Sequence, residues 1–395
     1  MISFEKQRLD AGFAAAFGTE PERYFSAPGR TEIGGNHTDH QRGRVLAAAV
    51  NLDTRAAVKA NNLGRIRVLS QGYPLCEISV GEWEPRPAEQ GSTSALIRGV
   101  AAGFARLGCP VRGFDAYVTS TVLPGSGLSS SAAFEVLIGT IINALFHGDK
   151  ANPGQVAAIG QWAENVHFGK PCGLMDQMAS AVGGLVTIDF ADADAPAVRQ
   201  VDFDFSACGH ALCILDTGAD HADLTPEYGA IPAEMVAIAR YFGKNVLSQV
   251  PEGEFYRHLP ALRQSCGDRA VLRAIHYYNE NRRVDAQVQA LEQGDFETFL
   301  ELVRQSGRSS YMLLQNVIVP GRPGQEMALT LALCEQLLDG KGACRVHGGG
   351  FAGTVQAFVP LDLLEKFRRS VEQILGQGSC HVLQIRPQGG IELFE

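Results

Sequence analysis

A glycine- and serine-rich stretch at positions 123–133 has the residue types that bind an anionic group. It reads LPGSGLSSSAA and lies between a strand-like alternation at 114–122 and an apolar run at 132–146 that predicts a helix. Gly125 and Gly127 allow close backbone approach, the helix N-terminus favours negative charge, and three consecutive serines add hydroxyls for phosphate or Mg²⁺. The stretch matches neither the P-loop nor the Gly-x-Gly-x-x-Gly pattern. It predicts either a phosphate-binding loop of another design or a turn capped by serine.

A dense group of polar residues at positions 30–40 is a second candidate site. It contains one cation, two carboxylates, two imidazoles and an amide, namely Arg30, Glu32, Asn36, His37, Asp39 and His40. Because buried polar groups need partners, such density favours a solvated loop or a binding site over a core. Two histidines flanking Asp39 also suggest metal ligands, but no further His/Cys cluster at ligand spacing supports a metal.

Two further segments hold single residues that could do chemistry. Asp176 stands among apolar neighbours after a turn containing Gly169 and Gly173, and either caps a helix or is held for catalysis. Glu164, on the preceding helix, is by default an ordinary exposed residue. The segment 347–353, HGGGFAG, has more glycine than a hairpin needs and predicts a close backbone approach to a ligand.

The whole chain has the composition of an ordinary soluble globular protein. Its 395 residues are 45% hydrophobic and 19% charged, and this length predicts two domains with a boundary near 205–210. The net charge of −9 argues against non-specific nucleic-acid binding. No signal peptide and no uninterrupted apolar run of membrane-spanning length are present, and nine scattered cysteines suit free thiols in the cytoplasm.

The elements that must position these residues follow from periodicity and from turn residues. Strands are expected at 45–52, 55–59, 66–70, 114–122, 185–190, 211–216, 343–347, 354–359 and 381–386. Helices are expected at 5–17, 92–107, 132–146, 227–242, 284–293, 296–305, 324–338 and 361–375. The strands at 343–347, 354–359 and 381–386, with the helix at 361–375, form a βαβ-like end of the chain.

Four motifs in this order resemble the GHMP kinase superfamily and, within it, the galactokinase family. They are Pro28-Gly29-Arg30 with His37-Thr38-Asp39, the loop that ends in Ser129-Ser130-Ser131-Ala132-Ala133, Gly173-Leu174-Met175-Asp176-Gln177, and the glycine loop 347–353. The resemblance extends from about residue 24 to residue 360. It implies a two-domain α+β GHMP kinase fold, with an N-terminal α/β domain at 1–207 of a type shared with a ribosomal protein. A C-terminal ferredoxin-like domain at 208–395 follows, and the active site lies between the two.

The resemblance also implies a role for each motif residue. Asp176 would be the base facing the anomeric hydroxyl, and Arg30 the cation that lowers the pKa of Asp176 and keeps it anionic. The sugar would be lined by Asn36, His37, Asp39, Gly173 and Tyr228. ATP would be bound by Gly125, Ser126, Gly127, Leu128, Ser129, Ser130, Ser131, Gly349 and Gly350. Mg²⁺ would be held by Ser131 and Glu164.

The sequence departs from the family pattern at both ends of the expected site. Asn36 stands where galactokinases have Glu, and Thr31-Glu32-Ile33 replaces the usual Val-Asn-Leu. In the glycine loop, His347 replaces Thr and Ala352 replaces Gly. Position 36 predicts either weak galactose binding or a preference for a modified hexose. A protonated His347 facing phosphate would give tighter ATP binding as the pH falls toward about 6.5, and a structural His347 that points away from the phosphate is the equal alternative.

The resemblance thus implies ATP-dependent phosphorylation of the anomeric hydroxyl of galactose or a close relative. A kinase for another sugar, such as an N-acetylhexosamine, and a non-catalytic sugar/ATP sensor are the alternatives. The expected partners are the sugar and ATP, with no nucleic acid or membrane, and the chain is expected to be a monomer or weak homo-oligomer.

Overall fold

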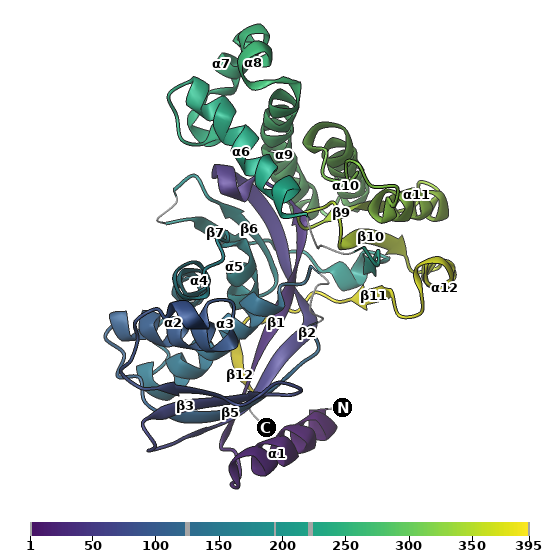
Figure 1. The fold of residues 1–395 in the computed structure, drawn as a ribbon. Helices are drawn as coiled ribbons and strands as arrows, with labels where there is room; N and C mark the ends of the chain where they lie inside the picture. Colours follow the sequence, from purple (N-terminus) through teal and green to yellow (C-terminus); the bar gives the residue numbers. More distant parts are fainter. Residues whose placement is uncertain (1, 123–126, 193–194, 220–223, 394–395) are drawn as a thin grey trace.

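The chain folds around two β-sheets in the computed structural model, which describes residues 2–122, 127–192, 195–219 and 224–393 (Figure 1). The first sheet is formed mainly by the N-terminal half of the chain and the second by the C-terminal half. The final short strand, β12, returns to the first sheet.

The first sheet has eight strands among the described residues, in the order β12-β1-β2-β5-β3-β4, with β6 paired to β2 and β7 to β6. They are β1 (Arg23–Gly34), β2 (Arg44–Ala60), β3 (Arg65–Ser70), β4 (Cys76–Ser79), β5 (Phe114–Ser120), β6 (Leu185–Asp189), β7 (Ala197–Gln200) and β12 (Ile391–Leu393). The pairing of β1 with β2 shifts register between Pro28 and Arg30 and again between Glu32 and Gly34. The first irregularity lies at the start of the polar block that the sequence singles out, and the second lies within it.

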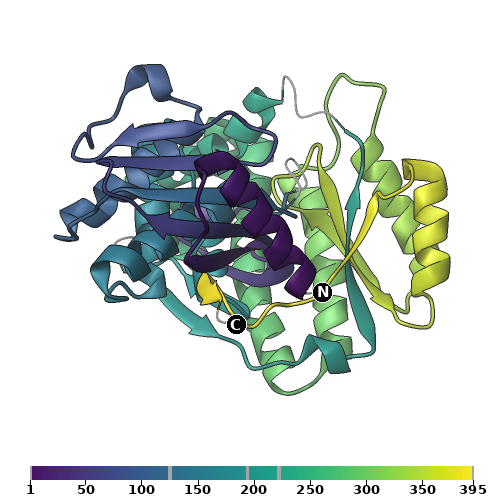
Figure 2. The same ribbon diagram turned by 90° about the horizontal axis from the view of Figure 1, so that it is seen from below.

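Helices α2 to α5 pack on one face of this sheet, and α1 lies against β2 and β5 on the other (Figures 1 and 2). The helices are α1 (Ile2–Phe17), α2 (Thr93–Arg106), α3 (Ser130–Ile142), α4 (Pro153–Trp162) and α5 (Met175–Val182). α2 begins where the sequence predicts, because the Ser92 side chain accepts a hydrogen bond from the amide of Ala95. α3 and α4 each continue into a π-helical turn, at Asn143–His147 and Ala163–Phe168.

α3 and its π-helical turn form an apolar helix at the centre of this half. By length and composition alone, Ser130–His147 is apolar enough to cross a membrane, with a mean hydropathy of 1.3 over 18 residues. Over half of this stretch (56%) is buried inside the fold, where α3 packs against α2, α4, α5 and β1. It is therefore the core helix of this layer.

The second sheet has the order β11-β8-β10-β9, and all neighbouring strands are antiparallel. Its strands are β8 (His210–Asp216), β9 (Ala343–His347), β10 (Thr354–Pro360) and β11 (Cys380–Leu383). β10 and β11 are parallel to each other with β8 between them, and α12 (Leu364–Leu375) connects them. This split βαβ unit is typical of ferredoxin-like domains.

Helices also cover both faces of the second sheet. α11 (Glu326–Leu338) and α12 pack on the outer face. α9 (Asp268–Glu292) and α10 (Phe296–Ser309) pack on the inner face, where one core also includes apolar residues of β1, β2 and β6. The two sheets are thus joined by a shared hydrophobic core rather than by a flexible linker.

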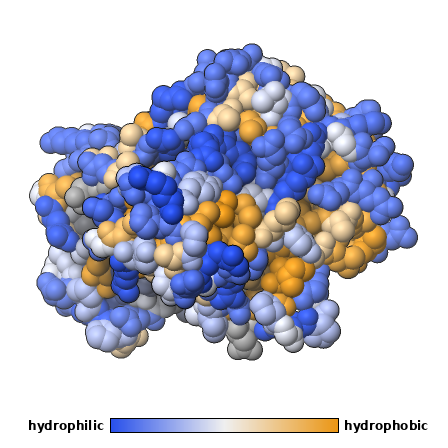
Figure 3. All heavy atoms as spheres, turned by 90° about the horizontal axis from the view of Figure 1, so that it is seen from above, coloured by the Kyte–Doolittle hydropathy of each residue, from blue (hydrophilic) through white to orange (hydrophobic). Residues whose placement is uncertain are grey.

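α6 (Thr225–Tyr241), α7 (Glu252–Arg257) and α8 (Leu259–Cys266) pack beside α9 in a helical group at the top of Figure 1. Seen from that side, the molecular surface is largely hydrophilic, with hydrophobic side chains gathered in smaller patches (Figure 3). The sequence predicted only the last third of α9, as a helix at 284–293, and it did not predict α7 or α8.

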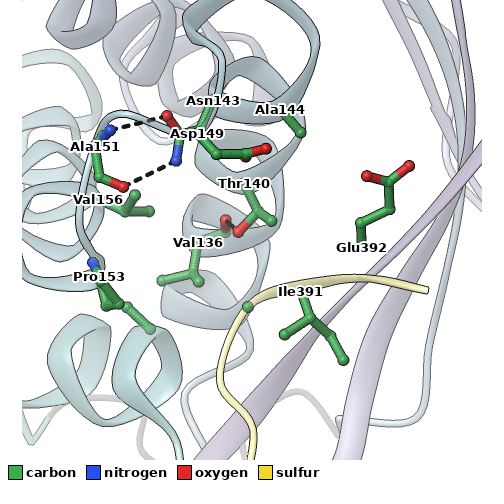
Figure 4. A pocket seen from close by; sticks show the side chains of 12 residues that line it. Val136, Thr140, Asn143, Ala144, Asp149, Ala151, Pro153, Val156, Ile391 and Glu392 are labelled. Atoms are coloured by element: carbon green, nitrogen blue, oxygen red, sulfur yellow. Dashed lines mark hydrogen bonds between the residues drawn. The ribbon is translucent and has the colours of Figure 1, made fainter. Parts of the chain in front are cut away.

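β12 is held beside β1 by strand pairing and by an ion pair. Arg23 on β1 donates from Nε to Oε1 of Glu392 over 2.5 Å. A pocket of about 310 Å³ lies between β12, α3 and the start of α4 (Figure 4). Asn143 at its rim exchanges two hydrogen bonds with the backbone of Ala151. None of the expected site residues lines this pocket.

Candidate active site

The serine-rich loop leads into the N-terminus of α3 as the sequence predicts. Gly127 and Ser129 both have positive φ, at 71° and 55°. This is an uncommon conformation for a serine and one that often marks a functional site. The Ser129 hydroxyl makes no capping bond to α3, so the alternative of a serine-capped turn is wrong. Two residues expected to bind ATP, Gly125 and Ser126, lie outside the described residues.

Arg30 ties this loop to β1 through both its backbone and its side chain. Its amide donates to the carbonyl of Leu128 over 3.0 Å, and its Nη1 donates to the carbonyl of Gly127. Gly29, next to Arg30, has to be glycine, because a Cβ there would lie 2.9 Å from the Leu128 carbonyl oxygen. The loop and β1 are therefore in direct backbone contact.

Arg30 also holds Asp176. Its Nε donates to Oδ1 of Asp176 over 2.7 Å, while the Ser129 hydroxyl donates to Oδ2. Asp176 lies in the first turn of α5 but does not cap it, since Leu174 occupies the cap position. The alternative of a helix cap is therefore wrong.

The environment of Asp176 keeps its carboxylate ionised. Burial raises the pKa of Asp176. The attraction of Arg30 and the hydrogen bonds from Arg30 and Ser129 together lower this pKa by more than burial raises it, so the net shift is downward. The Arg30 side chain is 7% exposed, whereas that of Asp176 remains 33% exposed. Asp176 is thus an anion that a small substrate can reach.

Glu164 is buried in the π-helical turn after α4, and not exposed as its default interpretation had it. Its Oε1 lies 3.4 Å from the Ser131 hydroxyl and 3.3 Å from Nζ of Lys170. Its Oε2 accepts from Nε2 of Gln177, which also donates to Glu135. Burial and the neighbouring charge of Glu164 raise the pKa of Glu135 to about 9, so Glu135 is protonated at neutral pH.

Ser131 and Glu164 fit a magnesium ion. One hydroxyl and one carboxylate oxygen are hard donors of the kind that Mg²⁺ prefers, and Lys170 already places a cation on the same carboxylate oxygen. The described residues contain no group of three or more His, Cys, Asp or Glu side chains that could hold a metal alone. Metal binding by the two histidines that flank Asp39 therefore finds no support in the described chain.

The polar block is not a solvated loop, because positions 30–34 belong to β1 and are buried. The block continues as a tight loop and a 3-10 turn at Asp39–Gln41. Partners from the second half of the chain satisfy it. Glu280 on α9 accepts from the amide of Gly35 over 3.2 Å, and His276 contacts the carbonyl of Asn36 at 2.9 Å.

Asn36, expected to contact the sugar, is 1% exposed and has no free hydrogen-bonding capacity. Its amide nitrogen donates to Glu32 Oε1 over 3.1 Å and to the carbonyl of Gly348 over 2.7 Å. Its amide oxygen accepts from Asn316 over 2.9 Å and from Ser310 over 3.3 Å. Two donors and two acceptor positions are all that an asparagine side chain offers. Direct contact of Asn36 with the sugar is therefore not supported.

Asp39 and Gly173, expected at the sugar, lie close to Asp176, whereas His37 lies against the glycine loop. Burial, with some contribution from the charge of Asp176, raises the pKa of Asp39. Gly173 packs directly against Asp39, because a Cβ there would lie 2.3 Å from Oδ2 of Asp39 and the Asp39 carboxylate would have to move. His37 has a φ of 56°, and its Nε2 contacts the carbonyl of Gly349 at 3.0 Å. Burial lowers the pKa of His37 to about 4, so it is neutral.

The glycine loop is packed tightly against protein rather than against open space. Tyr228 donates to the carbonyl of Gly350 over 2.8 Å, and a Cβ on Gly349 would lie 2.8 Å from the Tyr228 ring. A Cβ on Gly350 would lie 2.1 Å from the carbonyl oxygen of Asn316. Packing against protein therefore explains why Gly349 and Gly350 are glycines, and no ligand is needed to explain them. The sequence had instead favoured a close backbone approach to a ligand.

His347 lies beside the phosphate loop, but its expected protonation is wrong. A Cβ on Gly127 would be 3.1 Å from its Nδ1. Nε2 accepts from the amide of Glu32 at 3.3 Å, which leaves Nδ1 as the protonated atom that donates to Thr354 over 2.8 Å. Burial, with Arg30 and Arg345 nearby, lowers the pKa of His347 well below its usual value.

Sequence reasoning missed the residues that brace the polar block from afar. These are His276, Glu280, Asn316, Arg345 and Gln356, all fully buried. One signal was available, because His276 and Glu280 are four residues apart and share a face of α9. The other three had no local pattern, since each serves a partner about 280 to 320 positions away.

Known proteins resemble this chain over nearly its full length. The family model "Galactokinase galactose-binding signature" matches residues 11–60, and the model for the GHMP kinase N-terminal domain matches residues 95–184. A galactokinase of Streptomyces coelicolor is 32% identical over 383 residues, which cover 96% of both proteins.

Solved structures share the fold. The galactokinase of Lactococcus lactis, crystallised with galactose, superposes with a TM-score of 0.82 at 24% identity over 99% of this chain and all of that one. A mevalonate kinase superposes with a TM-score of 0.67 at 13% identity over 93% of this chain and all of that one. The α+β architecture of the GHMP kinases expected from the sequence is thereby confirmed.

Proposed function

The chain belongs to the galactokinase family of the GHMP kinases, and from this premise we propose that Asp176 and Arg30 transfer the γ-phosphoryl group of ATP to the anomeric hydroxyl of galactose. The products are galactose 1-phosphate and ADP. The observation that carries the assignment is the contact of Asp176 with both Arg30 and Ser129 at the N-terminus of α3.

Asp176 is the proton acceptor in this proposal. Its lowered pKa keeps it anionic at neutral pH, and its side chain remains accessible. The anomeric O–H gives its proton to the Asp176 carboxylate as the new bond from oxygen to γ-phosphorus forms. The bond from that phosphorus to the β,γ-bridging oxygen breaks, and ADP leaves with its electron pair.

Arg30 positions the base and stabilises negative charge. Its Nε orients Asp176 and its Nη1 holds the phosphate loop at Gly127, so one side chain sets the distance between base and phosphate. A guanidinium is always charged and presents several donors in a fixed plane, which suits charge that develops on the transferred group.

ATP and Mg²⁺ would lie at the start of α3. The helix N-terminus, the backbone of residues 127–131 and the Ser131 and Glu164 side chains would hold the triphosphate and the metal. When bound, Mg²⁺ neutralises phosphate charge and orients the γ-phosphoryl group. Gly349 and Gly350 support this site through their packing beside Tyr228 and Asn316.

The sugar would lie against Asp39 and Gly173, near Asp176, and against His37 and Tyr228, which contact the glycine loop. The buried Asp39 carboxylate supplies acceptors for sugar hydroxyls, and Gly173 leaves room beside it. An N-acetylhexosamine would be preferred only if Asn36 had free amide donors for the acetamido oxygen. Both of these donors are bound to protein acceptors. The intact base and cation likewise favour an enzyme over a sensor.

We also propose that the chain divides near residue 207 into two domains that meet at this site, and that it acts as a monomeric or weakly associating enzyme of the cytoplasm. Both sides contribute: Arg30 and Asp176 precede residue 207, whereas Tyr228 and the glycine loop follow it. All nine cysteines are free, in line with a reducing compartment.

The proposal is tested by ADP release with ATP, Mg²⁺ and a panel of sugars. Galactose should give the highest kcat/KM, ahead of glucose, mannose and N-acetylgalactosamine. ADP release that does not depend on sugar, or a clear preference for N-acetylgalactosamine, would contradict it.

A further inference from the structure

A buried network joins β1 to β9 behind the expected sugar site, and its centre is the trio of Glu32, Asn36 and Arg345. Arg345 donates from Nη2 to Oε1 of Glu32 over 2.5 Å and from Nη1 to the carbonyl of Ile33 over 2.7 Å. Asn36 donates to the same Glu32 oxygen over 3.1 Å. One carboxylate oxygen thus receives both the guanidinium and the amide.

All three members are almost completely buried, with exposed fractions of 4% for Glu32, 1% for Asn36 and 0% for Arg345. A buried guanidinium without a carboxylate partner, or two buried carboxylates for one guanidinium, is strongly unfavourable. The trio therefore requires one acid and one neutral amide at positions 32 and 36.

The trio controls where the glycine loop sits. Asn36 donates its second amide hydrogen to the carbonyl of Gly348 over 2.7 Å, and the adjacent His37 contacts the carbonyl of Gly349. His37 also precedes Asp39 by two residues. The position of the sugar-facing residues relative to the glycine loop therefore depends on the orientation of Asn36.

The acid and the amide stand in the reverse order from the pattern that this chain resembles. That pattern has Asn at the position of Glu32 and Glu at the position of Asn36, so both arrangements supply one acid and one amide. In this structure the two side chains are hydrogen-bonded to each other, four residues apart. A glutamate at position 36, one methylene longer than asparagine, would extend toward the point that Glu32 Oε1 now occupies beside Arg345.

We propose that positions 32 and 36 form one exchangeable acid–amide pair serving Arg345, and that in this chain Asn36 is a positioning residue for the sugar site rather than a sugar ligand. The inference rests on the proposed galactose kinase activity. It predicts that the identity of each residue matters less than the presence of one acid and one amide.

The test compares Glu32→Asn, Asn36→Glu and the double variant that carries both changes. Glu32→Asn removes the carboxylate that is hydrogen-bonded to Arg345, and Asn36→Glu places a second carboxylate beside it. Each single variant should raise the KM for galactose at least about tenfold and lower the Tm, with a smaller change in the KM for ATP. The double variant should return both KM values to within about threefold of wild type.

Glu89→Gln is the matched control. Glu89 pairs with Arg98, a second fully buried arginine that lies on α2 outside the site. Loss of the Glu89 carboxylate should lower the Tm without changing the KM for galactose. This control therefore distinguishes an effect on the position of the sugar site from a general loss of stability.

Every outcome decides the inference. Single variants that fail to fold beside a double variant that folds and works support it. A double variant as impaired as the sum of the single variants overturns it, and so do single variants with wild-type KM values. A double variant whose KM for galactose falls below the wild-type value also overturns it, because residue 36 would then contact the sugar. Failure of the wild type to phosphorylate galactose contradicts the proposed function instead.

Discussion

The Nε of Arg30 lies 2.7 Å from Oδ1 of Asp176, although 146 positions separate the two residues in the chain. Arg30 comes from an irregular part of β1 and Asp176 from the first turn of α5. Because the same guanidinium also binds the carbonyl of Gly127, the base, the cation and the phosphate loop form one connected unit. The catalytic assignment rests on this unit.

Replacing the base should abolish most of the chemistry. Asp176→Asn removes the proton acceptor while keeping the shape of the side chain, so kcat should fall by about 10²–10⁴. Binding of a non-hydrolysable ATP analogue, measured by calorimetry, should change by less than about threefold. A variant that keeps more than about a tenth of wild-type kcat would exclude Asp176 as the base.

Arg30→Lys should lower kcat/KM by at least about tenfold even though it keeps the charge. Lysine cannot reach Asp176 and Gly127 at once with the planar geometry of a guanidinium. Arg98→Lys is the matched control, since Arg98 is also buried but binds Glu89 outside the site. Steady-state kinetics should show wild-type kcat for Arg98→Lys and a loss for Arg30→Lys.

The Mg²⁺ requirement should depend on Glu164 and not on Glu135. Glu164→Gln and Ser131→Ala each remove a hard oxygen donor, so the Mg²⁺ concentration for half-maximal rate should rise at least several-fold. Glu135→Gln should leave it unchanged, because a pKa of about 9 already makes Glu135 neutral at pH 7. Coincident Mg²⁺ titration curves for Glu164→Gln and wild type would remove Glu164 from the metal site.

Stability should fall as the pH is lowered from about 6.5 toward 4. Burial lowers the pKa of His37 to about 4 and that of His40 to about 3, whereas an unfolded histidine titrates near 6.5. Below about pH 6.5 the unfolded chain therefore binds protons that the folded chain does not, and the free energy of unfolding decreases.

The measurement is the Tm of wild type and of His40→Asn at several pH values between 7 and 5. The decline should be shallower in the variant, which has one buried imidazole fewer. Parallel curves would show that His40 does not contribute to the acid sensitivity.

Local patterns predicted those elements whose own residues dictate them. Ser92 marks the start of α2, and alternating apolar residues mark β5. α9 was predicted only over its last third, because its earlier part buries polar residues such as Arg273, His276 and Glu280. Buried polar residues on a helix break the apolar periodicity on which the prediction depends.

In the candidate site, too, local motifs could be predicted and long-range contacts could not. The motif residues Arg30, Ser129 and Asp176 were identified from the sequence, and the structure brings them into contact. The roles of Asn36 and His347 could not be predicted, because each depends on a distant hydrogen-bond partner: Asn316 is 280 positions from Asn36, and Thr31 is 316 positions from His347. Only the tertiary fold shows that these two side chains are already satisfied.

The most direct test of the account is to locate the phosphate on the product of the reaction with galactose. Proton-coupled phosphorus-31 NMR of the mixture with ATP and Mg²⁺ should show a sugar phosphate whose phosphorus couples to the anomeric proton, formed in equal amount with ADP. The Asp176→Asn variant should form it at least about a hundredfold more slowly. No sugar phosphate from galactose, or phosphate on any other hydroxyl, would contradict the account.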